Sequence, residues 1–258
     1  MVFEGILIHR VAYKERDLIV KLLLRSGHVG SFYVYGGQGG GKKQKPTSFE
    51  LGAMLRIHIK DKKSTDLMVV NEHSRLWAPQ NIRHNIQAFY LTCLYFEVLQ
   101  KFAAPFQNGD FVTSENEGIF SVVSNALFYM DEALGKQGFV PEQHLSLFMI
   151  KLLFHLGIMP DTDSCSYCQT DLLNLTHVSF LPANGQFSCP QCLVNANSYI
   201  ENEKGFLLRI KKGYQTKYQD YHEFFGTTFS EGDKLIQYFC HHFQLKPVEL
   251  KSYSLLLK

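Results

Sequence analysis

Two Cys-x-x-Cys pairs, Cys165/Cys168 and Cys189/Cys192, constrain the fold of this chain more than any other feature, and twenty residues separate them. A Cys-x-x-Cys turn directs two thiolates to one point, and two such turns complete the tetrahedron of soft ligands that zinc prefers. The alternatives are two disulfides or buried free thiols, but neither requires matched pairs at this spacing. The spacing predicts one structural Zn²⁺ bound by all four sulfurs, with no open position for a catalytic water.

The residues between the two pairs predict a β-hairpin. Segments 176–181 and 186–188 have strand-like composition, and Asn184-Gly185 supplies the bend between them. Such a hairpin would return Cys189 toward the first pair. We therefore expect a zinc ribbon at about residues 161–195.

The first 80 residues predict a small β-barrel. Five short runs are rich in β-branched and aromatic residues, and in the fourth run apolar and polar residues alternate, as in a strand with one buried face. No intervening helix is long enough to connect parallel neighbours. A five-stranded OB-fold is the expected barrel, and an SH3-like barrel is the alternative. The runs are 2–9, 18–24, 29–35, 51–59 and 66–70.

From residue 81 onward the apolar residues recur at helical intervals. Gly157 and Pro160 end one helix just before the first cysteine pair, and Ser230 with Asp233 resembles a capping box that opens another. The predicted fold class is α+β, with an OB-fold domain at 1–80 and an all-helical domain at 81–258 that contains the zinc ribbon. The expected helices lie at 82–99, 119–130, 142–156 and 230–243, while 205–225 is ambiguous.

Positive charge is concentrated in the predicted barrel. Residues 1–80 hold 13 Lys and Arg against 7 Asp and Glu, a balance of +6, so the total of +2 leaves −4 for the remainder. This asymmetry suggests an anionic partner such as nucleic acid, although a solvated surface is the alternative. The candidate DNA-binding residues are Arg10, Arg16, Lys21, Tyr33, Tyr35, Lys42, Lys43 and Lys45. Lys14 belongs with Arg10, Arg16 and Lys21 to a basic cluster around the first turn, and Phe32 is an alternative stacking residue.

The glycine-rich segment 36–43 nearly matches a phosphate-binding P-loop. Lys43 stands where such a loop needs Ser or Thr, and no long helix follows. A flexible loop that brings Lys42, Lys43 and Lys45 to a phosphate backbone is the favoured interpretation. A nucleotide hydrolase is a rival, and a solvated hairpin tip is the other alternative.

Neither a targeting segment nor a membrane span is recognisable, and cysteines bound to metal fit a reducing compartment. The expected location is cytoplasmic and nucleoid-associated, without membrane partners. No nucleophile–histidine triad or HExxH pattern at a family spacing is recognisable either. We expect a binding protein and not an enzyme.

The order of these features resembles the RecO family of bacterial recombination mediators. The resemblance rests on the Leu-Gly-x-x-Pro run at 156–160 before the first cysteine pair, on the opening segment 5–10 and on the zinc-ligand spacing. It implies an OB-fold, a helical domain and an embedded zinc ribbon. A run of glycines replaces the arginine-rich stretch that the family usually carries after the third strand.

The resemblance also implies function and partners. A RecO-like protein binds single- and double-stranded DNA, anneals complementary strands and works with RecR to load RecA onto DNA coated with single-stranded DNA-binding protein. Its helical domain docks the acidic C-terminal tail of that coating protein, and its basic loop contacts DNA. A scaffold for protein interactions, with an architectural ribbon and no annealing activity, is the alternative.

Overall fold

The computed structural model describes residues 1–38, 49–59, 67–103, 117–194 and 202–256. The chain forms two compact units, Met1–Gly135 and Lys136–Lys258. The first unit thus contains the barrel together with two helices that follow it. The predicted domain boundary at residue 80 coincides with the change from strands to helices. That residues 1–80 and 81–258 are separate domains stays a prediction.

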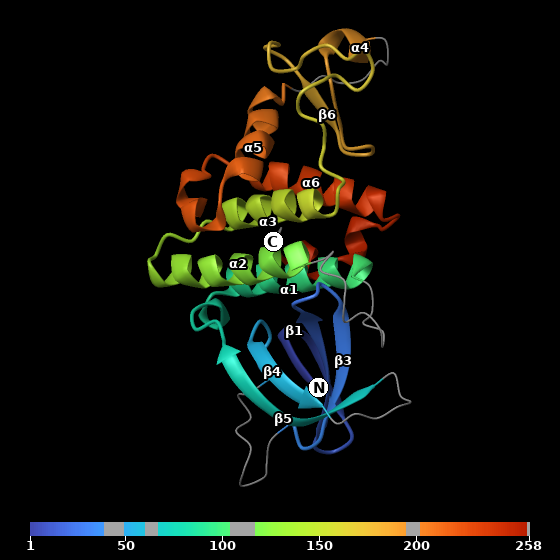
Figure 1. Cartoon of the computed structure of the whole chain (residues 1–258). Helices are drawn as coiled ribbons and strands as arrows, with labels where there is room; N and C mark the ends of the chain where they lie inside the picture. The colour runs from blue at the N-terminus through green and yellow to red at the C-terminus, as the bar shows by residue number, and fades with distance from the viewer. Residues whose placement is uncertain (39–48, 60–66, 104–116, 195–201, 257–258) are drawn as a thin grey trace. The chain divides into compact units, whose positions relative to one another are not determined.

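Five strands form a closed barrel in the order β1-β2-β3-β5-β4 (Figure 1). β3 pairs with β5 in parallel, and the other pairs are antiparallel. This closed five-stranded arrangement confirms the expected OB-type barrel. The strands are β1 (Val2–Tyr13), β2 (Asp17–Leu24), β3 (Val29–Val34), β4 (Met54–Ile59) and β5 (Met68–Trp77).

Period-two burial in β4 follows the predicted pattern. Leu55 and Ile57 are fully buried in the barrel, while Arg56 and His58 between them are exposed. Burying such a side chain contributes about 1.5–3 kcal/mol to folding. The barrel core also includes Leu7, Leu18, Val20, Leu22, Leu24, Phe32, Val34 and Phe49.

β1 and β5 extend beyond their predicted ends. β1 continues to Tyr13 because its second half pairs with β2 beyond a bulge between Leu7 and His9. β5 continues to Trp77 because residues 71–77 pair with β4, although most of their side chains are exposed. Neither extension carries a continuous apolar alternation, and so the pattern did not reveal it.

Two helices complete the first unit, α1 (Ile86–Phe102) and α2 (Glu117–Gly135), and the 3₁₀ turn η2 (Ile82–His84) precedes them. α1 begins where the side chain of Asn85 accepts a hydrogen bond from the backbone N–H of Ala88 at 3.0 Å. This contact satisfies one of the donors that a helix start leaves without an intrahelical partner.

The second unit is built around α3 (Pro141–His155), which contacts both α5 (Lys204–Gln215) and α6 (Phe229–His242). α3 ends as predicted. Gly157 has a φ of +70°, and the N–H of Ile158 donates to the carbonyl of Leu153 at 3.0 Å. These contacts form a Schellman motif, which turns the chain toward the cysteine-rich segment.

The capping box of α6 differs from the predicted one. It uses Thr228 and Glu231 and not Ser230 and Asp233, because the helix begins at Phe229. Both pairs have the same spacing, and the earlier one occupies the helix start. The ambiguous segment becomes α5 followed by η5 (Tyr218–Glu223), and the described chain ends with η6 (Pro247–Glu249) and α7 (Lys251–Leu256). Within the described ranges, no helix is long and apolar enough to cross a membrane.

Candidate metal centre and nucleic-acid interface

The four predicted cysteines meet at one point. The sulfur atoms of Cys165, Cys168, Cys189 and Cys192 all lie within 4.8 Å of one another, and the sulfurs of Cys168 and Cys189 are 3.6 Å apart. A tetrahedral zinc with Zn–S bonds of about 2.3 Å would place its sulfur ligands roughly 3.8 Å apart. The cluster therefore has the size and the donor atoms of a four-sulfur zinc centre.

The first cysteine pair lies in a tight turn. The N–H of Gln169 donates to the carbonyl of Cys165 at 2.9 Å, and the N–H of Cys165 donates to the carbonyl of Thr170 at 2.8 Å. Gln169 closes the turn with a φ of +61°. The two thiols therefore face the same side of the turn.

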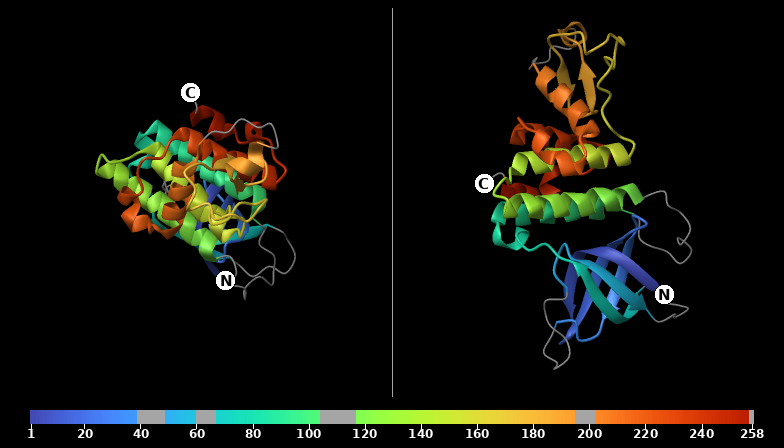
Figure 2. Two further views of the ribbon diagram at one scale, coloured as in Figure 1. Left: turned by 90° about the horizontal axis from the view of Figure 1, so that it is seen from above. Right: turned by 60° about the vertical axis from the view of Figure 1, so that its left-hand side comes forward.

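A short hairpin brings the second pair to the first. β6 (Ser179–Leu181) and β7 (Gln186–Ser188) pair as predicted, and Gly185 in the bend has a φ of +65°. The backbone N–H of Cys189 then donates to the sulfur of Cys165 at 3.3 Å. In Figure 2 the hairpin and the short helix α4 (Pro190–Val194) gather at one end of the second unit.

Charge repulsion at the cluster favours a bound cation. The Thr170 hydroxyl lowers the pKa of Cys168 to about 6, whereas hydrogen bonding to Cys168 raises the pKa of Cys192 to about 12. Four thiolates this close repel one another strongly unless a cation lies between them. A soft divalent ion such as zinc satisfies this requirement.

The ribbon is attached to the helices by buried polar contacts. The carboxylate of Glu203 accepts a hydrogen bond from the N–H of Phe180 on β6 and pairs with the ammonium of Lys234 on α6. The hydroxyl of Tyr238 donates to the carbonyl of Ile158 at 2.6 Å. These contacts hold the hairpin, the linker after α3 and α6 together.

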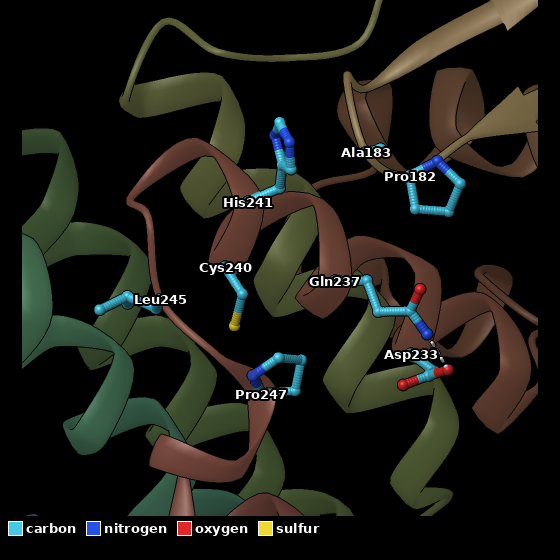
Figure 3. Close-up of a pocket in the computed structure, with 8 residues that line it drawn as sticks. All are labelled: Pro182, Ala183, Asp233, Gln237, Cys240, His241, Leu245 and Pro247. Carbon is cyan, nitrogen blue, oxygen red and sulfur yellow. Dashed lines mark hydrogen bonds between the residues drawn. The ribbon is translucent and has the colours of Figure 1, made fainter.

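A pocket of about 360 Å³ lies between the hairpin bend and α6 (Figure 3). The carboxylate of Asp233 in its wall accepts hydrogen bonds from Gln237 at 2.7 Å and from the hydroxyl of Tyr253. The volume of this pocket is at the lower end of the range found for small-molecule binding pockets. The lining residues are Pro182, Ala183, Asp233, Gln237, Cys240, His241, Leu245 and Pro247.

The outer side of β1, β2 and β3 presents apolar and aromatic side chains. Val11 pairs with Ile19, and Ile19 pairs with Tyr33, so these three residues form one row across the strands. The next row begins with Tyr13, which is 43% exposed, and Tyr35 just beyond β3 is 62% exposed. We call Val11, Tyr13, Ile19, Tyr33 and Tyr35 the tyrosine face.

Tyr33 supports its two neighbours on this face. Tyr33 is 7% exposed, and its ring meets the rings of Tyr13 and Tyr35 at centroid distances of 5.7 and 4.6 Å. The hydrogen bond that its hydroxyl donates to Asp17 raises the pKa of Tyr33 to about 12 and lowers that of Asp17. Tyr13 and Tyr35 therefore offer more open ring surface than Tyr33. Phe32, the alternative stacking residue, is wholly buried in the barrel.

The predicted cations occupy different positions around this face. Lys14 lies over the ring of Tyr13 at 5.5 Å, Arg16 is exposed in the same turn, and Lys21 is partly buried on β2. The guanidinium group of Arg10 instead donates a hydrogen bond to the backbone carbonyl of Phe49 at 2.7 Å. Lys42, Lys43 and Lys45 lie outside the described residues.

The described start of the glycine-rich segment is tied to the turn between β1 and β2. The N–H of Gly36 donates to the Asp17 carboxylate at 2.9 Å, and the side chain of Gln38 donates to the Asp17 carbonyl at 2.9 Å. The backbone N–H of Gln38 also donates to the carbonyl of Arg16 at 3.0 Å, so residue 38, where this described range ends, lies beside Arg16. Sequence reasoning missed Val11, Tyr13 and Ile19, which only the strand register reveals.

A closed OB-type barrel followed by helices that carry a four-cysteine cluster defines an α+β protein that joins an oligonucleotide-binding type of barrel to a four-sulfur metal site. Residues 113–253 match the family model described as the recombination protein O C-terminal region, which is more than half of the 258 residues. The chain belongs to the RecO family, whose members are non-catalytic recombination mediators in DNA repair. No curated protein matches the chain in sequence.

Proposed function

We propose that this protein binds single- and double-stranded DNA, anneals complementary strands and, together with RecR, helps to load RecA onto DNA coated with single-stranded DNA-binding protein. The tyrosine face is the observation that carries the proposal. Its two exposed rings, Tyr13 at the end of β1 and Tyr35 just beyond β3, lie beside the face of β2 and β3, which is the face that OB-folds use to bind oligonucleotides.

The proposed mechanism is binding without bond breaking. Unpaired bases stack on Tyr13 and Tyr35, and Lys14, Arg16 and Lys21 contact the phosphates beside them. Lys42, Lys43 and Lys45 extend this contact from the loop that starts beside Asp17. The DNA is then held by charge and stacking together, which tolerates any base sequence.

We assign a structural Zn²⁺ to Cys165, Cys168, Cys189 and Cys192. With four sulfur ligands it has no position for water or substrate. Its role is to keep the ribbon folded against α6, where Glu203 and Lys234 meet.

The acidic tail of the single-stranded DNA-binding protein docks on the helical domain in this proposal. The pocket between the hairpin bend and α6 is a poor match for it, because the Asp233 carboxylate in the wall would repel an acidic peptide. A docking surface rimmed by cations fits that tail better.

The first test removes the two open rings. We expect the double variant Tyr13→Ala, Tyr35→Ala to weaken the binding of a fluorescent oligothymidylate at least about 30-fold, since each stacked base is worth roughly 1–3 kcal/mol and two such contacts are lost. Tyr167→Ala is the matched control, because Tyr167 on the ribbon is 60% exposed and Tyr35 is 62% exposed. Equal affinity of the double variant and the control would contradict the tyrosine face as the site.

A salt titration tests the cations. Single-strand affinity should fall with log salt at a slope of about −0.7 per neutralised phosphate, and replacing Lys42, Lys43 and Lys45 with Ala should flatten the slope. An unchanged slope would remove the loop from the site. Absence of strand annealing by the intact protein would favour the scaffold alternative, and magnesium-dependent phosphate release would favour the hydrolase.

A further inference from the structure

Asp17, the first residue of β2, is hydrogen-bonded to the end of β3 and to the residues that follow it. One oxygen of its carboxylate accepts from the hydroxyl of Tyr33 on β3, and the other accepts from the backbone N–H of Gly36 at 2.9 Å. Its backbone carbonyl accepts from the side chain of Gln38 at 2.9 Å. A single residue thus joins the start of β2 to the end of β3 and to the start of the glycine-rich segment.

The contact with Tyr33 fixes the centre of the tyrosine face. The ring of Tyr33 meets those of Tyr13 and Tyr35 edge-on, at interplanar angles of 79° and 74°. Such edge-to-face pairs hold aromatic rings in a preferred orientation. Because Asp17 holds the hydroxyl of Tyr33, it fixes the ring against which the two open rings pack. The same bond raises the pKa of Tyr33 to about 12, so the hydroxyl remains a donor at neutral pH.

The contacts with residues 36–38 hold this part of the chain beside the first basic turn. Gly36 has a φ of +63°, a left-handed conformation that glycine adopts readily. The backbone N–H of Gln38 donates to the carbonyl of Arg16 at 3.0 Å. Lys14 and Arg16 lie in the turn between β1 and β2. The residues after β3 are therefore tied to the turn that carries these two cations.

The charge of Asp17 and its hydrogen bonds act in opposite directions on DNA affinity. A carboxylate close to a phosphate backbone repels it, so removal of the charge alone should strengthen binding. Loss of the hydrogen bonds releases Tyr33 and Gly36, and the incoming strand must then order the face as it binds, which costs affinity. The sign of the change in affinity therefore distinguishes the two roles.

We propose that Asp17 is a positioning residue for single-stranded DNA, which holds the tyrosine face and the cations of the turn at 14–16 in the arrangement that the strand contacts. This inference rests on the proposed function. Asp17 acts through Tyr33 and Gly36 and makes no contact with the DNA itself. A face that is ordered before the strand arrives loses less conformational freedom on binding, and its affinity is correspondingly higher.

The test compares three variants in the binding of a fluorescent oligothymidylate. Asp17→Ala removes the charge and both acceptors. Asp17→Asn removes only the charge, because its amide oxygen accepts from the N–H of Gly36 while its amide nitrogen donates to the hydroxyl of Tyr33, which rotates to accept. Glu15→Ala is the matched control, since it removes one carboxylate from an exposed position in the adjoining turn.

Asp17→Ala should weaken binding at least about 5-fold, because only a fraction of the molecules then present the ordered face. Asp17→Asn should restore the affinity to within about 2-fold of the intact protein. Glu15→Ala should bind equally or more tightly, since only repulsion is removed. Tighter binding by Asp17→Ala, or an equal loss in Asp17→Ala and Asp17→Asn, would overturn the positioning role.

A double-mutant cycle separates positioning from general destabilisation. Asp17→Ala added to the double variant Tyr13→Ala, Tyr35→Ala should weaken binding by less than it does in the intact protein, because the rings that it positions are already absent. The same fold-loss in both backgrounds would overturn the proposal.

Tyr33→Phe tests the same contact in a variant that keeps the ring and removes only the hydroxyl. It should weaken binding by about 2-fold or more, and circular dichroism checks that each variant is folded. Unchanged affinity in Tyr33→Phe would also overturn the positioning role. If loss of Tyr13 and Tyr35 lowers the affinity while loss of Asp17 does not, only the positioning role fails. If loss of the two rings has no effect, the tyrosine face of the proposed function fails.

Discussion

The carboxylate of Asp131 on α2 accepts a hydrogen bond from the backbone N–H of Asn81 at 2.6 Å. The same carboxylate accepts from the N–H groups of Gln80 and Ile82 at 3.1 and 3.0 Å. These three donors lie where the chain leaves β5, and Asp131 is 9% exposed. One side chain thus connects the end of the barrel to the second helix.

Replacement of this carboxylate should destabilise the first unit. We expect Asp131→Ala to lower the free energy of unfolding by about 2–3 kcal/mol, because buried N–H groups lose an ionised acceptor. Urea unfolding followed by the emission of Trp77, the single tryptophan, measures the change. Asn125→Ala at an exposed site on α2 is the control, and an equal effect of both variants would contradict the assignment.

Loss of one zinc ligand should unfold the ribbon locally. We expect about one zinc per intact chain and none in Cys168→Ala, since three sulfurs bind zinc much more weakly than four. Metal analysis by mass spectrometry measures this, and amide exchange at Gln169 should accelerate as the ribbon opens. Cys93→Ala on α1 should keep its zinc. Zinc at the native ratio in Cys168→Ala would disprove the four-sulfur centre.

A methyl group at Gly185 should separate the hairpin from α6. A Cβ there would lie 2.1 Å from the ring of Tyr238, and Gly185 has a φ of +65°. Gly226 has a similar φ of +76° with no atom within 4 Å of a built Cβ, so Gly226→Ala reports the backbone strain alone. We expect Gly185→Ala to cost about 1–3 kcal/mol more than Gly226→Ala in urea unfolding. Equal costs would show that the hairpin moves freely away from Tyr238.

Acidification should weaken the second unit through His144. Burial lowers its pKa to about 4, while its pKa in the unfolded chain is about 6.5. Its contribution is complete above the unfolded pKa, because neither state then binds the proton. As the pH falls from about 6.5 to 4, only the unfolded state takes up the proton, and the free energy of unfolding falls by up to about 1.4 kcal/mol per pH unit.

His144→Gln should flatten this dependence, since glutamine does not titrate. Urea unfolding followed by circular dichroism between about pH 7 and 5 gives the two slopes. His222→Gln, at an exposed position, should keep the slope of the intact protein. Parallel slopes in His144→Gln and the intact protein would show that His144 is not the group responsible.

Sequence reasoning succeeded where residue type alone carries the geometry. Cysteine spacing predicted the cluster, and alternation in β4 predicted its buried face. The glycine at 157 predicted the end of α3 because a positive φ favours that residue. These features are local, so a short stretch of chain is sufficient to recognise them.

Features that depend on register were not predictable in this way. Tyr13 was missed because its outward direction follows from pairing with Asp17 and not from its neighbours in sequence. The carboxylate of Glu50 before β4 meets Arg75 on β5 and Arg83 after it, although these segments are distant along the chain. Spacing within one segment carries no signal of such a meeting.

The bulge between Leu7 and His9 has a consequence for how this protein can vary. Uninterrupted alternation from Leu7, whose side chain lies inside the barrel, would point Val11 and Tyr13 inward too. One surplus residue reverses that parity halfway along β1, so a single strand fills the interior at one end and offers rings to solvent at the other. A deletion of one residue here would turn Val11 and Tyr13 toward the barrel interior, so the tyrosine face would be lost although all of its amino acids remain in the sequence.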